Sequence, residues 1–169
     1  MKLKIFLVAL LGISSIVFWA CNKEAAQSEL KVHMTDAPAA WDEVNIDLQE
    51  VQVKLGKDSS KWLTLQTNTG IYNLLGFQNG LDTVIAQGSF PTGEMVKEIR
   101  LIVGSDNSIV VSGQSYPLTI PSGAETGLKI KVHKPLQASL ENILIDFDAE
   151  LSIKEENGGY KLLPVIQLK

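Results

Sequence analysis

The chain has 169 residues, with 15 Lys or Arg against 19 Asp or Glu, and therefore a formal net charge of −4 at pH 7. This length is enough for one domain with its own hydrophobic core. Arginine occurs once, at Arg100, and no stretch concentrates basic residues. We therefore exclude nucleic-acid binding, which needs clustered cations to displace the counterions of phosphates.

The first 20 residues have the pattern of a secretory signal peptide. Lys2 and Lys4 form a short basic flank, and the 16 residues from Ile5 to Ala20 carry no charge. That apolar stretch is shorter than the roughly 20 residues that a membrane-spanning helix requires, and it ends in a small residue, as a signal peptide does. We predict that residues 1–20 are removed after export.

Cys21 is the only cysteine and directly follows Ala20. A secreted domain that relies on disulfides carries an even number of cysteines, so this thiol has a different role. The position resembles the lipobox of bacterial lipoproteins, whose cysteine receives a diacylglycerol and becomes the first mature residue. The alternatives are an ordinary signal peptide with a chance cysteine, and a core cysteine of a cytosolic protein.

The lipobox resemblance implies a location as well as a modification. It makes the lipid bilayer a partner through an acylated Cys21 and places the protein in the cell envelope. Because Asn22 rather than Asp follows the cysteine, the resemblance implies the outer membrane, while the periplasmic and external faces both stay open. We interpret residues 21–28 as a polar tether, since they show no apolar periodicity, and residues 29–169 as one β-sandwich domain.

The first half of this domain alternates between apolar and polar residues, as half-buried strands do. Leu30, Val32 and Met34 define one strand. The run 44–55 is apolar at even positions up to Leu48 and at odd positions from Val51 onward. A slip by one residue predicts a β-bulge near Gln49 and Glu50. Shorter strands are expected at 62–65 and 71–75.

The second half continues with strands, for which we predict the ranges 98–103, 108–111, 115–120, 128–132, 143–147, 151–154 and 160–168. Helix signals are limited to one turn at 37–41 and another around 81–87. Short strands at this spacing predict an all-β fold, an antiparallel β-sandwich of immunoglobulin-like or prealbumin-like type with at most one or two helical turns.

Histidines and glycine-rich loops offer no catalytic signal. His33 and His133 both fall on the polar phase of their strands, so we expect both to face solvent, and zinc sites normally need three or four ligands. There is no GxSxG motif for a serine hydrolase. The loop 121–129 (PSGAETGLK) departs from the phosphate-binding pattern, because Leu128 separates Gly127 from Lys129. We predict no cofactor.

Acidic residues are the strongest candidates for a site. Asp36 stands where the first strand meets Ala37-Pro38, and Asp146 and Asp148 alternate in IDFDAE. Carboxylates at strand ends can bind calcium, but the spacing matches no calcium loop. We interpret all three as structural, with Asp36 accepting hydrogen bonds from the amides that follow it, and keep a metal site as the alternative.

Six ordered segments resemble a known family. They are MTDAP (34–38), DEVNIDLQEVQV (42–53), FPTGEMVKEIRL (90–101), IPSGAETGLKI (120–130), LIDFDAELSI (144–153) and YKLLPVI (160–166). Together they resemble the bacterial family catalogued as domain of unknown function 4382, over about residues 29–168. The resemblance implies an exported protein, often a lipoprotein, and supplies no catalytic residues. The segment 90–101 also resembles the corresponding stretch of prealbumin-like sandwiches, an analogy of fold that does not determine function.

Two classes of function follow. The first is a non-catalytic binding or adhesion module for a glycan or an envelope protein, with Trp41, Trp62 and Tyr72 available to stack on sugar rings unless they are core residues. The second is a carbohydrate-active hydrolase that uses Asp146 and Asp148, since same-face neighbours on a strand lie about 7 Å apart, a separation that suits paired carboxylates. We expect the first class, and no enzyme.

Overall fold

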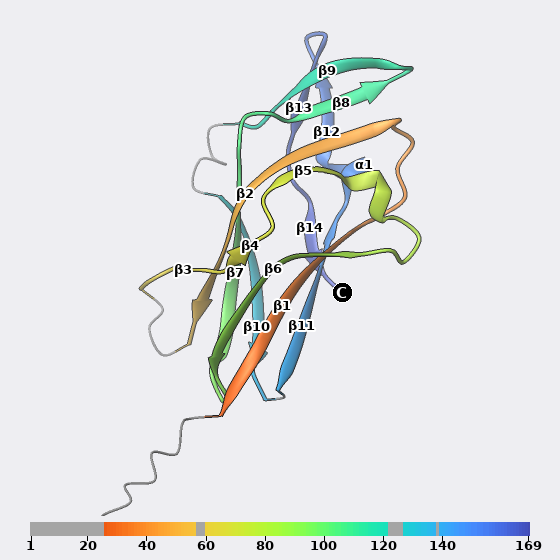
Figure 1. Cartoon of the computed structure of the whole chain (residues 1–169). Helices are drawn as coiled ribbons and strands as arrows, with labels where there is room; N and C mark the ends of the chain where they lie inside the picture. Colours follow the sequence, from red (N-terminus) through yellow and green to blue (C-terminus); the bar gives the residue numbers. More distant parts are fainter. Residues whose placement is uncertain (1–25, 57–59, 122–126, 138) are drawn as a thin grey trace, which may run out of the picture.

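The computed structural model describes residues 26–56, 60–121, 127–137 and 139–169, and in them two β-sheets face each other (Figure 1). One sheet has five strands in the order β14 (Ile166–Leu168), β11 (Leu140–Phe147), β1 (Gln27–Asp36), β6 (Thr83–Pro91) and β4 (Gln66–Thr67). We call it the first sheet. β1 begins at Gln27, so the predicted tether 21–28 ends earlier than expected.

The second sheet has nine strands. Its path runs β10 (Leu128–Pro135), β7 (Met95–Val103), β2 (Glu43–Leu55), β8 (Ser108–Val111), β9 (Gln114–Thr119), β13 (Gly159–Leu162) and β12 (Ile153–Glu156), and β3 (Leu63–Thr64) and β5 (Gly70–Asn73) also pair with β2. The predicted all-β sandwich is therefore confirmed.

One core fills the space between the sheets. Strand residues that alternate in the sequence also alternate in burial: Leu30, Val32 and Met34 of β1 are at most 3% exposed, whereas Lys31 and His33 between them are half-buried. Successive side chains of a strand point to opposite faces, so this alternation gives each sheet an apolar inner face. Removing those faces from water is the main favourable contribution to folding.

The sheets are mixed rather than wholly antiparallel. β1 pairs with β11 in parallel from Glu29–Leu140 to Asp36–Phe147, and β13 pairs in parallel with β9. Parallel neighbours need a long connection, because a hairpin reverses the chain direction. Most of the domain lies between β1 and β11 in sequence, so this condition is met. The prediction of an antiparallel sandwich is wrong for these two pairs and right for the remaining ones.

The predicted β-bulge in β2 is confirmed. The register between β2 and β7 shifts between Leu48 and Glu50. Asp47, which precedes the bulge in the sequence, is only 8% exposed. Its backbone oxygen accepts a hydrogen bond from Gly104 N at 2.7 Å, and its carboxylate accepts one from Asp106 N at 3.4 Å. The bulge thus places a carboxylate where it holds the loop between β7 and β8.

One edge of the sandwich is closed by a segment that crosses between the sheets. Leu63–Thr64 pairs with β2 in the second sheet and Gln66–Thr67 pairs with β6 in the first. Leu65, between them, is 3% exposed, and its N–H donates to Val51 O at 2.9 Å. The expected strand 62–65 is therefore shorter, at Leu63–Thr64, and a second short strand follows the core residue Leu65 at Gln66–Thr67.

The helical turns lie at other positions than expected. Residues 37–41 are irregular, and 83–87 belong to β6, because pairing with β1 outweighs the local helical preference. Short helices form at η1 (Leu74–Phe77) and α1 (Ala149–Ser152), where Asn73 and Asp148 are N-caps whose side chains accept a backbone hydrogen bond. In the part of the chain that the structure describes, no helix has the length and apolar character to cross a membrane.

We predict that Gly104→Ala destabilises the protein. A Cβ at this position would overlap Asp47 Oδ2 and lie 2.8 Å from Asp47 Cγ, and forcing extra volume into a packed site costs about 1–3 kcal/mol. Urea unfolding of the purified protein measures the loss. Gly76→Ala is the matched control, because its Cβ would meet no atom within 4 Å; equal unfolding midpoints for the two variants would show that the Asp47 contact is not tight.

Candidate functional site at the end of β1

Asp36 joins three segments at the end of β1, which we call the distal end. The residue is 2% exposed. One carboxylate oxygen accepts a hydrogen bond from Ala149 N at 2.9 Å, and the other accepts one from the Gln78 side-chain amide at 3.2 Å. We expected Asp36 to bind the amides that follow it, but its donors come from α1 and from the segment after η1. The carboxylate therefore connects parts of the chain that are 113 residues apart.

Burial sets the ionisation of Asp36. The loss of solvent raises the pKa of this carboxyl, and the negative charges of Asp146 and Asp148 raise it further, whereas the hydrogen bonds from Ala149 and Gln78 oppose the rise. Burial dominates because it disfavours the charged form of an acid. The fold therefore raises the proton affinity of Asp36.

Asp148 caps α1. Its side chain accepts a hydrogen bond from Leu151 N at 2.9 Å, and its backbone oxygen accepts one from Ser152 N at 3.0 Å. Side-chain acceptors at an N-cap satisfy amides that the first turn of a helix leaves without partners. Asp36 accepts a hydrogen bond from the nearby amide of Ala149, so the two carboxylates bind two of the N-terminal amides of one short helix.

Asp146 lies on the face of β11 opposite to Ile145 and Phe147, and it pairs in register with Thr35 of β1. Its side chain is 8% exposed and forms an ion pair with Lys169, with Oδ2 and Nζ 3.0 Å apart. The other oxygen, Oδ1, is buried and has no hydrogen-bond partner among the described residues. Asp146 is therefore engaged by one oxygen only.

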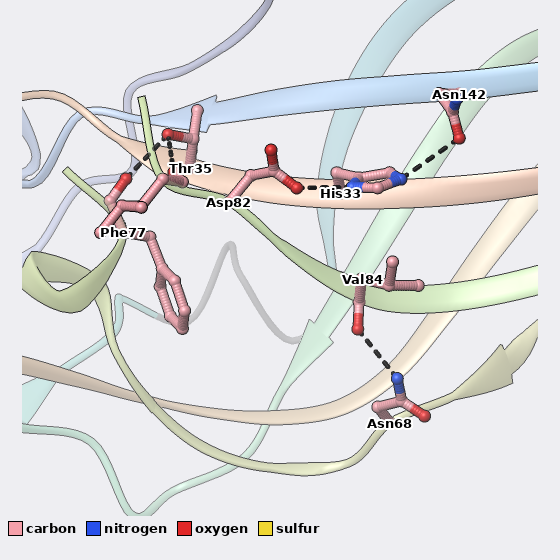
Figure 2. Close-up of polar contacts among 8 residues, drawn as sticks. His33, Thr35, Asn68, Phe77, Asp82, Val84 and Asn142 are labelled. Atoms are coloured by element: carbon pink, nitrogen blue, oxygen red, sulfur yellow. Dashed lines mark hydrogen bonds and ion pairs between the residues drawn. The ribbon is translucent and has the colours of Figure 1, made fainter. Parts of the chain in front are cut away.

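A segment from Phe77 to Asp82, which we call the strap, crosses the outer face of the first sheet beside these acids. The Thr35 hydroxyl lies 2.8 Å from Phe77 O and 2.7 Å from Leu81 O, so it can donate to either carbonyl. Figure 2 shows these contacts together with the ring of His33, which stands between Asp82 and Asn142. The strap is thus held at both of its ends.

His33 lies on the outer face, as its polar phase predicts, but its ring is not free in solvent. Nδ1 lies 2.6 Å from Asp82 Oδ1, and Nε2 lies 3.2 Å from Asn142 Oδ1. Both ring nitrogens face oxygens, an arrangement in which both donate when the imidazole is protonated. His133 is exposed and belongs to β10 in the other sheet. The fold does not bring the two histidines into one sheet.

The acids do not line either of two hollows on the surface. One hollow of about 370 Å³ is bordered by the strands β4 and β6, and a smaller one of about 100 Å³ lies by β10, β11 and β14. Within the described ranges, no group of three or more His, Cys, Asp or Glu side chains is arranged to hold a metal ion. Asp36, Asp146 and Asp148 instead contact main-chain amides, a glutamine and a lysine.

The three aromatic residues considered for sugar stacking each contact another side chain. Trp41 packs edge-on against Tyr160, with ring centroids 6.2 Å apart. Trp62 covers the guanidinium of Arg100 at 4.4 Å. Tyr72 lies tilted against Phe77, and its hydroxyl donates to Asn68 O at 2.6 Å. Each ring is half-buried, so these aromatics mainly stabilise surface loops and strands.

Sequence reasoning missed two exposed apolar residues at the distal end. Leu81 of the strap is 62% exposed, and Leu151 of α1 is 61% exposed. Both belong to segments that the contacts of Asp36 and Thr35 hold at the end of β1. No periodicity marks them, because the strap is irregular and α1 has only four residues. The distal end therefore exposes two leucines on segments that the buried Asp36 and its neighbour Thr35 hold in place.

We predict that Asp36 makes the stability of the protein fall with rising pH. Its pKa is higher in the folded protein than in the unfolded chain, so the folded state binds the proton more tightly, and stability declines from about pH 4 to above the raised pKa. Asp36→Asn keeps an oxygen acceptor and cannot ionise. The difference in unfolding free energy, natural protein minus Asp36→Asn, should therefore decrease as pH rises from 4 to 8.

Urea unfolding at several pH values measures this difference. Asp36→Ala is the companion variant, because it leaves the buried Ala149 N–H without its acceptor and should cost about 1–3 kcal/mol at neutral pH. A difference between the natural protein and Asp36→Asn that grows with pH would contradict the assigned direction.

We predict that calcium does not stabilise the protein through the distal acids. Two of the three carboxylates already accept backbone hydrogen bonds, and the third pairs with Lys169, so a cation would have to replace these contacts. The melting temperature should be the same with calcium and with a chelator. A calcium-dependent rise that Asp146→Asn abolishes would establish the metal site instead.

Comparison with known proteins identifies the chain at the level of a family. The family model described as "Domain of unknown function (DUF4382)" matches residues 27–164, which span the sandwich from β1 to the end of β13. No curated protein matches the chain, and no solved structure matches it. The resemblance stated from the sequence is therefore confirmed: the chain belongs to the family of the domain of unknown function 4382.

Proposed function

We propose that the protein is a lipoprotein of the bacterial cell envelope whose β-sandwich is a non-catalytic binding module. The main support for a binding role is the contrast between the acids and the leucines of the distal end. The acids suited to catalysis are engaged in internal contacts, whereas Leu81 and Leu151 are more than 60% exposed on the segments that those acids hold. We infer that these two leucines serve as contacts for a partner, because both lie on segments held at the same end of β1.

The lipid anchor is supported by the N-terminal sequence. Cys21 lies outside the described residues, and its position after a basic flank and an apolar run that ends at Ala20 supports lipidation. A diacylglycerol together with a further acyl chain would hold the protein on a membrane, because one chain alone binds only marginally. We propose the outer membrane, since Asn22 follows the cysteine.

An envelope protein is the better of the two partner classes. Leucine side chains bury apolar surface against protein, whereas sugar recognition relies on free aromatic faces and polar groups. The aromatic rings of Trp41, Trp62 and Tyr72 are already in contact with other side chains. A glycan is the second partner class, and glycan-array binding of the protein tests it directly.

We predict that Cys21 is lipidated in the cell. Cells that express the protein are grown with a fatty-acid analogue, and the protein is then examined for the label. The natural protein should carry the label, and Cys21→Ala should lose it, because the thiol is the only site for the diacylglycerol. Label retained by Cys21→Ala would contradict the lipoprotein assignment.

We predict that the distal leucines contact an envelope protein. A photo-crosslinking amino acid placed at Leu81 or at Leu151 should give a discrete covalent product in intact cells. The same amino acid at Lys129, which is exposed on β10 of the second sheet, is the matched control and should give none. Equal yields at all three positions would contradict a distal binding site.

A separate assay of glycoside turnover tests the non-catalytic assignment. Turnover by the natural protein that Asp146→Asn abolishes would contradict it.

A further inference from the structure

The end of the sandwich where β1 begins is built by turns of both sheets, and we call it the proximal end. Thr92 N donates to Ala26 O at 2.8 Å, Gly93 N donates to Leu136 O at 2.7 Å, and Glu29 N donates to Ser139 O at 2.8 Å. In Figure 1 this end, with the starts of β1 and β11, lies at the bottom of the view. The first described residue, Ala26, is therefore attached to this end and to no other.

The length of chain before Ala26 limits how far this end can lie from a membrane. Five residue steps separate Cys21 from Ala26. A fully extended chain advances at most about 3.3–3.6 Å per residue, so these steps reach roughly 17 Å. β1 alone has 10 residues, and at about 3.3 Å per residue it is roughly 33 Å long. A lipid at Cys21 thus keeps the proximal end close to the bilayer.

The proximal end exposes apolar side chains from both sheets. Met95, the first residue of β7, is 36% exposed, and Leu140, the first residue of β11, is 43% exposed. Pro91, the last residue of β6, is also exposed. Met95 pairs with Pro135 and Leu140 pairs with Glu29, so both lie at the strand ends nearest to the turns. These residues lie at the end of the sandwich from which the chain leads to Cys21.

The outer faces of the sheets are unsuited to lie on a bilayer. The face of the second sheet carries charged side chains that pair across strands, as Lys54 does with Glu98 at 3.8 Å. The face of the first sheet carries Lys31, which pairs with Glu29 at 3.5 Å, and the polar row of His33 and Asn142. Moving such groups from water into an apolar layer is costly, and the tether permits the end-on arrangement that avoids this cost.

We propose that the proximal end is a membrane-contact surface, at which Met95 and Leu140 touch the lipid bilayer while the distal end points away from it. This inference rests on the proposed lipidation of Cys21. It gives the exposed apolar residues two separate roles, because Leu81 and Leu151 are at the far end of β1 and beyond the reach of the same membrane. A partner that binds the distal leucines would then lie at a distance from the bilayer that is set by the length of β1.

Site-specific fluorescence on the full lipidated protein tests the contact. Met95→Cys, Leu140→Cys and Leu151→Cys each introduce one thiol, which is the only reactive one because the Cys21 thiol carries the lipid. Each variant is labelled with a polarity-sensitive fluorophore and reconstituted into vesicles of phosphatidylethanolamine and phosphatidylglycerol that contain spin-labelled lipid. We expect quenching at positions 95 and 140 that is several-fold stronger than at position 151, with blue-shifted emission only at 95 and 140.

Flotation of the same samples distinguishes a failure of the lipid anchor from a failure of the end-on contact. Protein that floats with the vesicles but shows equal quenching at all three positions overturns the end-on contact and leaves the lipid anchor intact. Protein that does not float overturns the anchor and, with it, the membrane contact. Strong quenching at 151 with little at 95 and 140 overturns the assigned orientation.

Discussion

The parallel pairing of β1 with β11 is the constraint on which the rest of the structure depends. It joins the beginning of the described chain to a strand more than 100 residues later and places both in the middle of the first sheet, between β14 and β6. The pairing begins at Glu29 and Leu140 and ends at Asp36 and Phe147. There the hydrogen bond from Ala149 N to Asp36 continues the connection beyond the last strand residues. The backbone pairing of β1 with β11 and the hydrogen bond from Ala149 N to Asp36 therefore hold the same two segments together.

Burial of the Asp36 carboxyl group costs free energy, and the hydrogen-bond donors around it offset this cost. A carboxylate removed from water is stable only when donors replace the solvent, and Ala149 and Gln78 supply them. The same contacts close the first turn of α1 and hold the strap that follows η1. An acid that performs this work inside the fold is poorly placed for acid–base chemistry, because a catalytic carboxylate must reach a substrate. Asp36 therefore has a structural role, because both of its oxygens accept hydrogen bonds from within the fold.

The two ends of the sandwich differ in what they expose and in how they are connected. The proximal end joins the segment that leads to Cys21, and the distal end carries the strap and α1. Under the proposed lipidation of Cys21, the five residue steps before Ala26 are short compared with β1, so they keep the proximal end nearer to the bilayer than the distal end. Under the proposed anchoring at Cys21, the length of β1 sets the distance between the bilayer and the strap and α1. This geometry links the topology of the first sheet to the proposed envelope role.

The sequence by itself determined the strand-rich core, the bulge in β2 and the family. Alternation in Leu30, Val32 and Met34, and the slip at Gln49, are local signals, because side-chain direction along a strand follows from residue spacing alone. Tertiary structure decided which strands pair in parallel, since that choice depends on residues more than 100 positions apart. It also decided that Asp36 binds Ala149 and not the amides beside it, and that 83–87 is a strand. These outcomes depend on a partner segment that no local pattern specifies, and the exposure of Leu81 and Leu151 depends on the same long-range contacts.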